Sequence, residues 1–122
     1  MSVREVRPAR GPVIGTVRPP GSSNSANRAL VVTALAEGES VLEGAGLSGD
    51  TRVCAEALRR LGIGVEVDEA ARRMRVAGCA GRVPPGPADL YTGESGTATR
   101  FLTALVAAGR GRYRIRGAPS MR

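Results

Sequence analysis

The sequence predicts an α/β fold assembled from repeated β-α-β-α-β-β units, with about one and a half units present. Hydrophobic residues make up 42% of the 122 residues but aromatic residues only 2%, so the core must be aliphatic, which favours packed α/β layers. Amphipathic helical patterns alternate with short strand-like runs along the chain. A small-residue loop, a helix and a strand ending in Gly-Ala also occur twice, at Gly44-Ala45 and at Gly117-Ala118, which indicates an internal repeat.

A strand, a helix and a second strand open the first unit. Residues 13–17 predict a short strand, which a Pro-Pro-Gly turn ends. After a polar loop at residues 22–25, apolar residues spaced at i and i+4 predict a helix over residues 26–36, and Gly38 ends it. Residues 40–43 then predict the second strand.

A second helix and a hairpin complete this unit. Residues 44–49 form a glycine-rich loop, and Asp50 is predicted to cap a helix that ends at Gly62. Residues 63–67 and 74–77 predict two strands that pair as a hairpin.

The same order then begins again. Residues 90–92 predict a strand, residues 93–97 a small-residue loop, residues 98–108 a helix and residues 112–116 a final strand. The sequence stops where the second helix of this copy would begin. We therefore expect a fragment, or one partner of a larger assembly.

The charged residues exclude several kinds of chemistry. The chain has 18 basic and 11 acidic residues, a net charge of +7 and no histidine, and every basic residue is an arginine. Imidazole bases, Ser-His-Asp nucleophiles, His-ligated metal sites and lysine Schiff bases are therefore impossible within this sequence. Arginine, carboxylates, hydroxyls and backbone amides remain.

Composition also bears on location and partners. The arginines are scattered and few aromatic rings are present to stack on bases, so we expect no specific nucleic-acid partner. The longest apolar run, residues 29–36, is too short to span a bilayer, and residues 1–10 do not resemble a signal peptide. Cys54 and Cys79 lack C-x-x-C spacing, which predicts free thiols, with a disulfide as the alternative. We therefore expect a cytoplasmic chain with no membrane partner.

Each copy of the repeat places a polar loop at a helix N-terminus, with an arginine close behind. Free amide N–H groups, the positive end of the helix dipole and a guanidinium together suit a phosphate or a carboxylate. The first set comprises Ser22, Ser23, Asn24, Ser25 and Arg28. The second set comprises Gly93, Ser95, Gly96, Thr97 and Arg100. Ordinary N-capping beside a surface arginine is the alternative for either set alone, but the recurrence favours an anionic ligand.

A second motif suggests a different ligand. Residues 44–49 read G-A-G-L-S-G, a literal G-x-G-x-x-G, and Glu66 and Asp68 follow about 20 residues later, as a dinucleotide fingerprint requires. Two features argue against this reading. Asp50 places a carboxylate where the pyrophosphate would lie, and residues 40–43 are too short and polar for a central parallel strand. A nucleotide-binding module is therefore the weakest alternative.

Two stretches of the chain are distinctive enough to compare with a known family. The first reads PGSSNSANRAL at residues 20–30 and continues in residues 34–38 and 50–52. The second reads YTGESGTATRFL at residues 91–102 and continues in GAPSMR at residues 117–122. In order and spacing they resemble the N-terminal portion of the EPSP synthase (3-phosphoshikimate 1-carboxyvinyltransferase) family of enolpyruvyl transferases.

This resemblance implies the enolpyruvyl transferase fold, in which two domains of three such units hold the substrates between them. Residues 20–122 would be a partial domain, with a first unit at 20–88 and the start of a second at 89–122. Residues 1–19 would be a lead-in or strand of the interdomain region. The implied reaction moves the enolpyruvyl group of phosphoenolpyruvate to the 5-hydroxyl of shikimate 3-phosphate, in chorismate and aromatic amino acid biosynthesis. It implies no metal and no organic cofactor.

The resemblance also implies roles for individual residues. The shikimate 3-phosphate site would contain Ser22, Asn24 and Arg28. The phosphoenolpyruvate side would contain Gly96, Thr97 and Arg100, with Asp50 near the site.

The sequence departs from the family pattern at the substrate-binding positions. The family reads P-G-S-K-S, so Ser23 occupies the position of its active-site lysine and Asn24 that of the following serine. Glu94 stands where the family's G-N-x-G-T has an amide. Losing a cation and gaining an anion beside phosphorylated substrates would each cost on the order of a few kcal/mol in a desolvated site.

Two functions from different classes therefore stay open. The first is the N-terminal part of an enolpyruvyl transferase, inactive alone because the second domain with its carboxylate base is missing. The second is a non-catalytic or repurposed homologue that binds an anionic metabolite or a partner chain. The overall motif match favours the first, whereas Ser23 and Glu94 favour the second. We assign no catalytic residue within this sequence.

Overall fold

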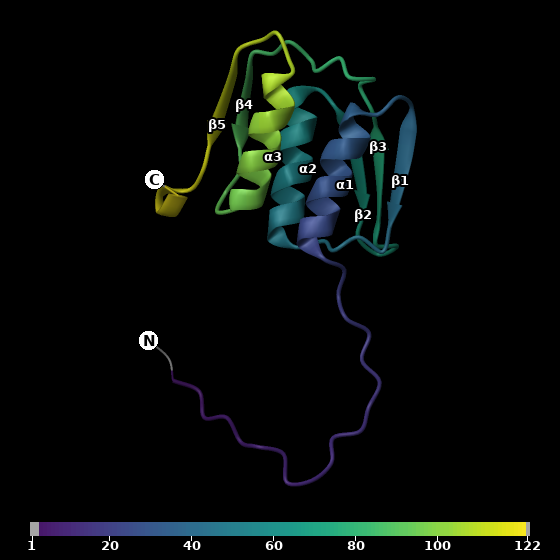
Figure 1. Ribbon diagram of the computed structural model, residues 1–122, viewed down its shortest axis with the longest axis vertical. Coiled ribbons are helices and arrows are strands. Elements are labelled where there is room, and N and C mark those ends of the chain that lie inside the picture. The colour runs from purple at the N-terminus through teal and green to yellow at the C-terminus, as the bar shows by residue number, and fades with distance from the viewer. Residues whose placement is uncertain (1–2, 122) are drawn as a thin grey trace.

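A computed structural model gives the structure of the protein over residues 3–121 (Figure 1). The elements are α1 (Ser23–Leu35), β1 (Glu39–Glu43), α2 (Gly49–Leu61), β2 (Gly64–Asp68), β3 (Arg73–Ala77), β4 (Ala88–Tyr91), α3 (Gly96–Ala107) and β5 (Tyr113–Arg116). A short 3-10 helix, Pro119–Met121, comes last. The predicted α/β class and the predicted hairpin of β2 and β3 are confirmed.

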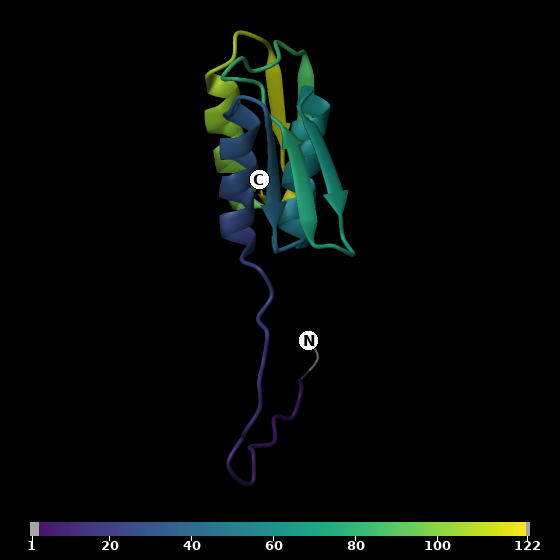
Figure 2. The ribbon, with the colours of Figure 1, turned by 90° about the vertical axis from the view of Figure 1, so that its right-hand side faces the viewer.

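The three helices lie side by side, with one sheet on either side of them (Figure 1, Figure 2). In the first unit, β3 pairs antiparallel with both β1 and β2, so that Met74 lies opposite Leu42 and Val67. In the second, β4 and β5 pair parallel and are connected through α3. Helix α2 contacts β2 of one sheet and β4 of the other, and it therefore joins the two units.

One aliphatic core runs through both units. Leu30 of α1, Leu58 of α2, Met74 of β3, Leu90 of β4 and Leu102 of α3 are completely buried and belong to a single cluster. Full burial of such a side chain stabilises the folded state by about 1.5–3 kcal/mol. This cluster packs α1, α2 and α3 together and so fixes where their N-termini lie.

The strand predicted over residues 13–17 is wrong. This segment leaves the body of the molecule as an irregular chain (Figure 1), and Val13, Ile14 and Val17 are 85%, 94% and 84% exposed. A strand requires a hydrogen-bonded neighbour, and within residues 3–121 none pairs with this segment. Residues 13–17 therefore have the alternating apolar pattern of a strand but belong to neither sheet.

All three helices begin with a serine cap, which corrects three predicted boundaries. Ser22 Oγ accepts from Ser25 N at 3.3 Å and Ser95 Oγ accepts from Ala98 N at 3.1 Å, so part of each predicted polar loop forms the first helical turn. Ser48, and not Asp50 as predicted, caps α2 by accepting from Thr51 N at 3.3 Å. The polar side chains satisfy backbone N–H groups that the helix itself leaves unpaired.

The cysteines are free thiols, as predicted. Cys54 is buried on α2, and this burial raises the pKa of its thiol to about 12, so it stays protonated at neutral pH. Cys79 is half-buried. Over residues 3–121, no helix has the length and apolar character needed to cross a membrane.

Two glycine backbones touch where the chain enters α1. A Cβ added to Gly21 would lie 2.5 Å from Gly44 O and from Gly46 N, and a Cβ added to Gly46 would overlap Gly21 O. Gly49, by contrast, has open space around its Cα. The central glycine of the G-x-G-x-x-G motif is therefore explained by backbone packing against the start of α1.

We expect Gly46→Ala to destabilise the fold by about 1–3 kcal/mol or more, because the clash is with backbone that cannot rotate away. The matched control is Gly49→Ala, which adds the same methyl group three residues later into open space at the start of α2. Urea unfolding followed by circular dichroism measures both. Equal midpoints for the two variants would show that the Gly21–Gly46 contact is not close.

We also expect the caps to differ in strength. Ser95→Ala should cost about 1–2 kcal/mol because Ser95 is buried and caps α3 at 3.1 Å. Ser22→Ala should cost about 0.5–1 kcal/mol because Ser22 is exposed and water replaces its bond to Ser25 N. Thermal unfolding of the two variants makes the comparison, and a larger loss for Ser22→Ala would contradict this ranking.

Candidate functional site

The N-termini of α1, α2 and α3 lie at the same end of the molecule (Figure 1). The first turn of a helix carries backbone N–H groups without intrahelical acceptors, and its N-terminus is equivalent to about half a positive charge. Each serine cap satisfies one of these N–H groups, which leaves others in each turn for a ligand. This end of the molecule is therefore suited to anions.

The two predicted loops meet between α1 and α3. Asn24 and Arg28 lie one turn apart on α1 and face Thr97 and Phe101, which lie one turn apart on α3. Thr97 Oγ1 donates to Asn24 Oδ1 at 3.4 Å, and the Arg28 guanidinium carbon lies 5.9 Å from the centre of the Phe101 ring. This cation–π contact, worth about 0.5–1 kcal/mol at an exposed site, holds Arg28 beside the N-terminal turns of α3.

The Arg28 side chain has hydrogen-bond donors to spare. A cation–π contact uses none of the five N–H groups of a guanidinium. Arg28 is exposed, and the salt bridges formed within residues 3–121 involve other arginines. The same holds for Arg100, which is exposed on the first turns of α3 behind Gly96. Both predicted arginines can therefore bind an anion.

Hydrogen bonds tie the loop before α3 to α3 itself and to the segment that follows β5. Thr99 Oγ1 donates to Thr92 Oγ1 at 2.8 Å, and Ala118 N donates to Gly93 O at 2.7 Å. Thr92 and Ser95 are buried. These bonds fix the loop and the first turn of α3, so a ligand there would meet a preorganised surface.

Two carboxylates lie near the positive helix ends. Glu94 directly precedes the α3 cap, is exposed, and accepts a hydrogen bond from Ser120 Oγ at 2.6 Å. Asp50 is exposed in the first turn of α2. The helix dipole stabilises a carboxylate in such a position, and each carboxylate also opposes the binding of a further anion beside it.

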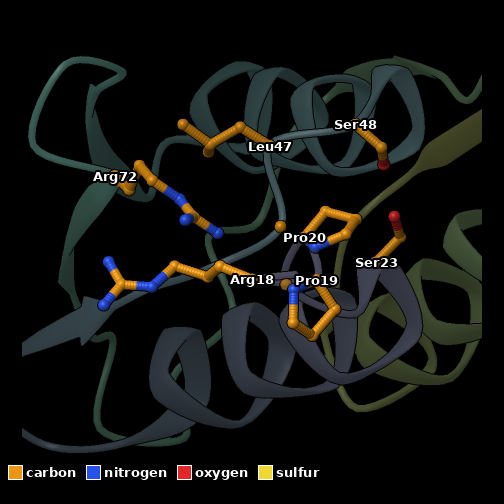
Figure 3. Close-up of a pocket in the computed structure, with 9 residues that line it drawn as sticks. Arg18, Pro19, Pro20, Ser23, Leu47, Ser48 and Arg72 are labelled. Atoms are coloured by element: carbon orange, nitrogen blue, oxygen red, sulfur yellow. The ribbon is translucent and has the colours of Figure 1, made fainter. Parts of the chain in front are cut away.

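Ser23 lines a pocket of about 560 Å³ beside the first turns of α1 and α2, and it is the one predicted site residue that does so (Figure 3). The full lining is Arg18, Pro19, Pro20, Gly21, Ser23, Gly46, Leu47, Ser48 and Arg72. Figure 3 shows the Ser23 and Ser48 hydroxyls on one side of the pocket and the Arg18 and Arg72 guanidiniums on the other. The structure thus separates Ser23 from Asn24 and Arg28.

Sequence reasoning missed Arg18, Arg72 and Asn27. Arg18 precedes α1 and Arg72 lies in the β2–β3 turn, so only the folded chain brings them to one pocket. Asn27 is completely buried on α1, and its carboxamide has no hydrogen-bond partner within residues 3–121. A polar residue on the helix face that continues through Leu30 and Ala34 is the signal that could have found it.

The donors at this end are thus guanidiniums, hydroxyls and backbone amides. Within residues 3–121, no three His, Cys, Asp or Glu side chains are placed together to hold a metal ion. The arrangement can therefore bind and orient anionic groups through electrostatics and hydrogen bonds.

The solved structure of an EPSP synthase from Acinetobacter baumannii has the same fold. It superimposes with a TM-score of 0.77 at 27% identity and covers 87% of this chain and 24% of that one. The predicted EPSP synthase-like architecture is thereby confirmed.

Curated relatives match over nearly the whole chain. The 3-phosphoshikimate 1-carboxyvinyltransferase of Nostoc punctiforme is 44% identical over 122 residues, which is 100% of this chain and 29% of the relative. That of Opitutus terrae is 47% identical over 119 residues, which is 96% of this chain and 28% of the relative. The chain thus spans less than a third of the length of these relatives.

The model of the family described as EPSP synthase (3-phosphoshikimate 1-carboxyvinyltransferase) matches residues 8–122. This match includes both signature stretches and every predicted site residue. The chain therefore belongs to the EPSP synthase family.

Proposed function

We propose that this chain supplies the N-terminal, anion-binding part of an enzyme that moves the enolpyruvyl group of phosphoenolpyruvate to the 5-hydroxyl of shikimate 3-phosphate. The hydrogen bond between Thr97 and Asn24 carries this proposal, because it joins the two signature stretches in one surface at the N-termini of α1 and α3. The proposal places this chain in the cytoplasm.

The site residues divide between the two substrates. Ser22, Asn24 and Arg28 lie at the shikimate 3-phosphate site. Gly96, Thr97 and Arg100 bind the phosphoenolpyruvate side, and Asp50 lies near the site. The free N–H groups of both helices and the exposed guanidiniums of Arg28 and Arg100 support this division, because each substrate meets one helix end and one arginine.

Bringing the two substrates together is itself an electrostatic problem. Two like unit charges 4 Å apart repel by about 1 kcal/mol in water and by about 4 kcal/mol at an effective dielectric constant of 20. Both substrates carry a phosphate and a carboxylate, so several such terms add. Helix N-termini and arginines at one end of the molecule oppose this repulsion without having to reorganise.

The chemistry requires proton transfers that this part of the enzyme does not supply. The 5-hydroxyl gives up its proton and its oxygen bonds to C2 of phosphoenolpyruvate, while C3 gains a proton. The tetrahedral intermediate then loses phosphate from C2 and a proton from C3, which restores the C2–C3 double bond. Near the site, the described residues offer only the Glu94 and Asp50 carboxylates. In this proposal the chain alone binds substrate, and turnover requires further polypeptide.

A non-catalytic or repurposed homologue is the second candidate. The hydrogen bond from Ser120 to Glu94 favours it, because it holds a carboxylate beside the α3 cap. In that case an anionic metabolite or a partner chain binds at the same surface, and no turnover appears with any added polypeptide.

Calorimetric titration with shikimate 3-phosphate tests the assignment. Arg28→Gln should weaken binding by about 10–100-fold, since a hydrogen bond to a charged group is worth about 1.5–3 kcal/mol. The matched control is Arg110→Gln, which removes the same charge just beyond the opposite end of α3. Equal losses in the two variants would show that only the net charge attracts the ligand, and the assignment would be wrong.

A phosphate-release assay then separates the two candidates. Turnover that requires both this chain and the remaining polypeptide supports the transferase. Binding of shikimate 3-phosphate without turnover under those conditions supports the second candidate.

A further inference from the structure

A hydrogen bond joins the carboxylate of Glu94 to the segment that follows β5. Ser120 Oγ donates to Glu94 Oε1 at 2.6 Å, a length typical of a hydroxyl bound to an ionised carboxylate. Ser120 lies in the 3-10 helix, and Glu94 directly precedes the α3 cap. Both side chains are exposed, so water competes for each partner, and the bond persists only where the backbone holds the two residues together.

The backbone on both sides of this bond is held in place. Ala118 N donates to Gly93 O at 2.7 Å, so the residue before Glu94 is joined to the segment that contains Ser120. A Cβ added to Gly117 would lie 3.3 Å from Gly93 O, so the two segments pass each other closely. The hydrogen bond between Ser120 and Glu94 therefore joins segments whose backbones are already in contact.

The first turn of α3 has backbone N–H groups that Glu94 does not occupy. Ser95 caps the helix by accepting from Ala98 N at 3.1 Å. Within residues 3–121, no hydrogen bond joins Glu94 to Gly96 N or to Thr97 N, and these two N–H groups precede the first intrahelical bonds. They therefore stay available to a ligand.

Without the Ser120 hydroxyl, the Glu94 carboxylate would have the helix end as its nearest attraction. The N-terminus of a helix is equivalent to about half a positive charge and stabilises a carboxylate beside it. The Glu94 side chain is exposed and has several rotatable bonds, so a released carboxylate can turn toward the N–H groups of Gly96 and Thr97. It would then occupy donors that an anionic ligand needs.

We propose that Ser120 is a positioning residue, which holds the Glu94 carboxylate off the N–H groups of Gly96 and Thr97 and so leaves them open to phosphoenolpyruvate. The inference rests on the proposed function, which assigns Gly96 and Thr97 to the phosphoenolpyruvate side. Charge repulsion between Glu94 and the ligand remains, but the carboxylate does not compete for the same donors. Ser120 thereby preserves the helix end for substrate although a carboxylate precedes the cap.

The test is a titration of the ¹⁵N-labelled chain with phosphoenolpyruvate in the presence of shikimate 3-phosphate, at neutral pH. Ser120→Ala should weaken phosphoenolpyruvate binding by about two- to fivefold, which is the effect of a charge at a helix N-terminus. Ser120→Thr keeps the hydroxyl and should recover this loss. In a chain that already carries Glu94→Gln, Ser120→Ala should cause no further loss, because no carboxylate is left to release. Thr103→Ala, which removes an exposed hydroxyl farther along α3, is the control and should leave binding unchanged.

The ligand-free chain separates this inference from the proposed function. Ser120→Ala should shift the amide signals of Gly96 and Thr97 without any ligand, and it should not shift them in the Glu94→Gln background. If no variant binds phosphoenolpyruvate, the proposed function is wrong, and the amide signals alone decide whether Ser120 holds Glu94 off the helix end. Unshifted amides in Ser120→Ala, an equal shift in the Glu94→Gln background, or shifted amides with unchanged phosphoenolpyruvate affinity would overturn the positioning role.

Discussion

The contact between the backbones of Gly21 and Gly46 is the constraint on which the arrangement of the helix ends depends. No side chain fits between them, because a Cβ on Gly21 would lie 2.5 Å from Gly46 N. The start of α1 and the loop before α2 therefore pass each other at backbone distance, which sets the ends of both helices side by side. Leu30 and Leu102 pack α1 and α3 into the same core, so the third helix end follows.

Three helix N-termini placed together produce a positive electrostatic potential that favours anions. When no anion is bound, other groups of the protein must offset this potential. The exposed carboxylates of Glu94 and Asp50 lie at the N-termini of α3 and α2. In α1, the Arg28 guanidinium lies over the ring of Phe101. Stability and binding are thus linked, since any anion that binds only the folded chain also stabilises it.

Local patterns in the sequence predict the parts of the fold that local interactions decide. The hairpin of β2 and β3 and the cores of the helices follow from apolar spacing, and the order of elements from the recurrence of polar loops. The sequence pattern places the starts of α1 and α3 too late, because Ser22 and Ser95 suit a loop and a cap equally well. Residues 13–17 have the pattern of a strand but no neighbour within residues 3–121, and Arg18 and Arg72 meet only through long-range packing.

The two departures from the family motif are best understood separately. Successive residues of a helix point about 100° apart, so Ser23 lines the pocket beside α2 while Asn24 contacts α3. Glu94 bonds to Ser120 and shares no partner with Ser23. Beside Ser23, moreover, Arg18 and Arg72 supply positive charge from outside the helix. The absence of a lysine at residue 23 therefore does not leave this end of the molecule without a cation.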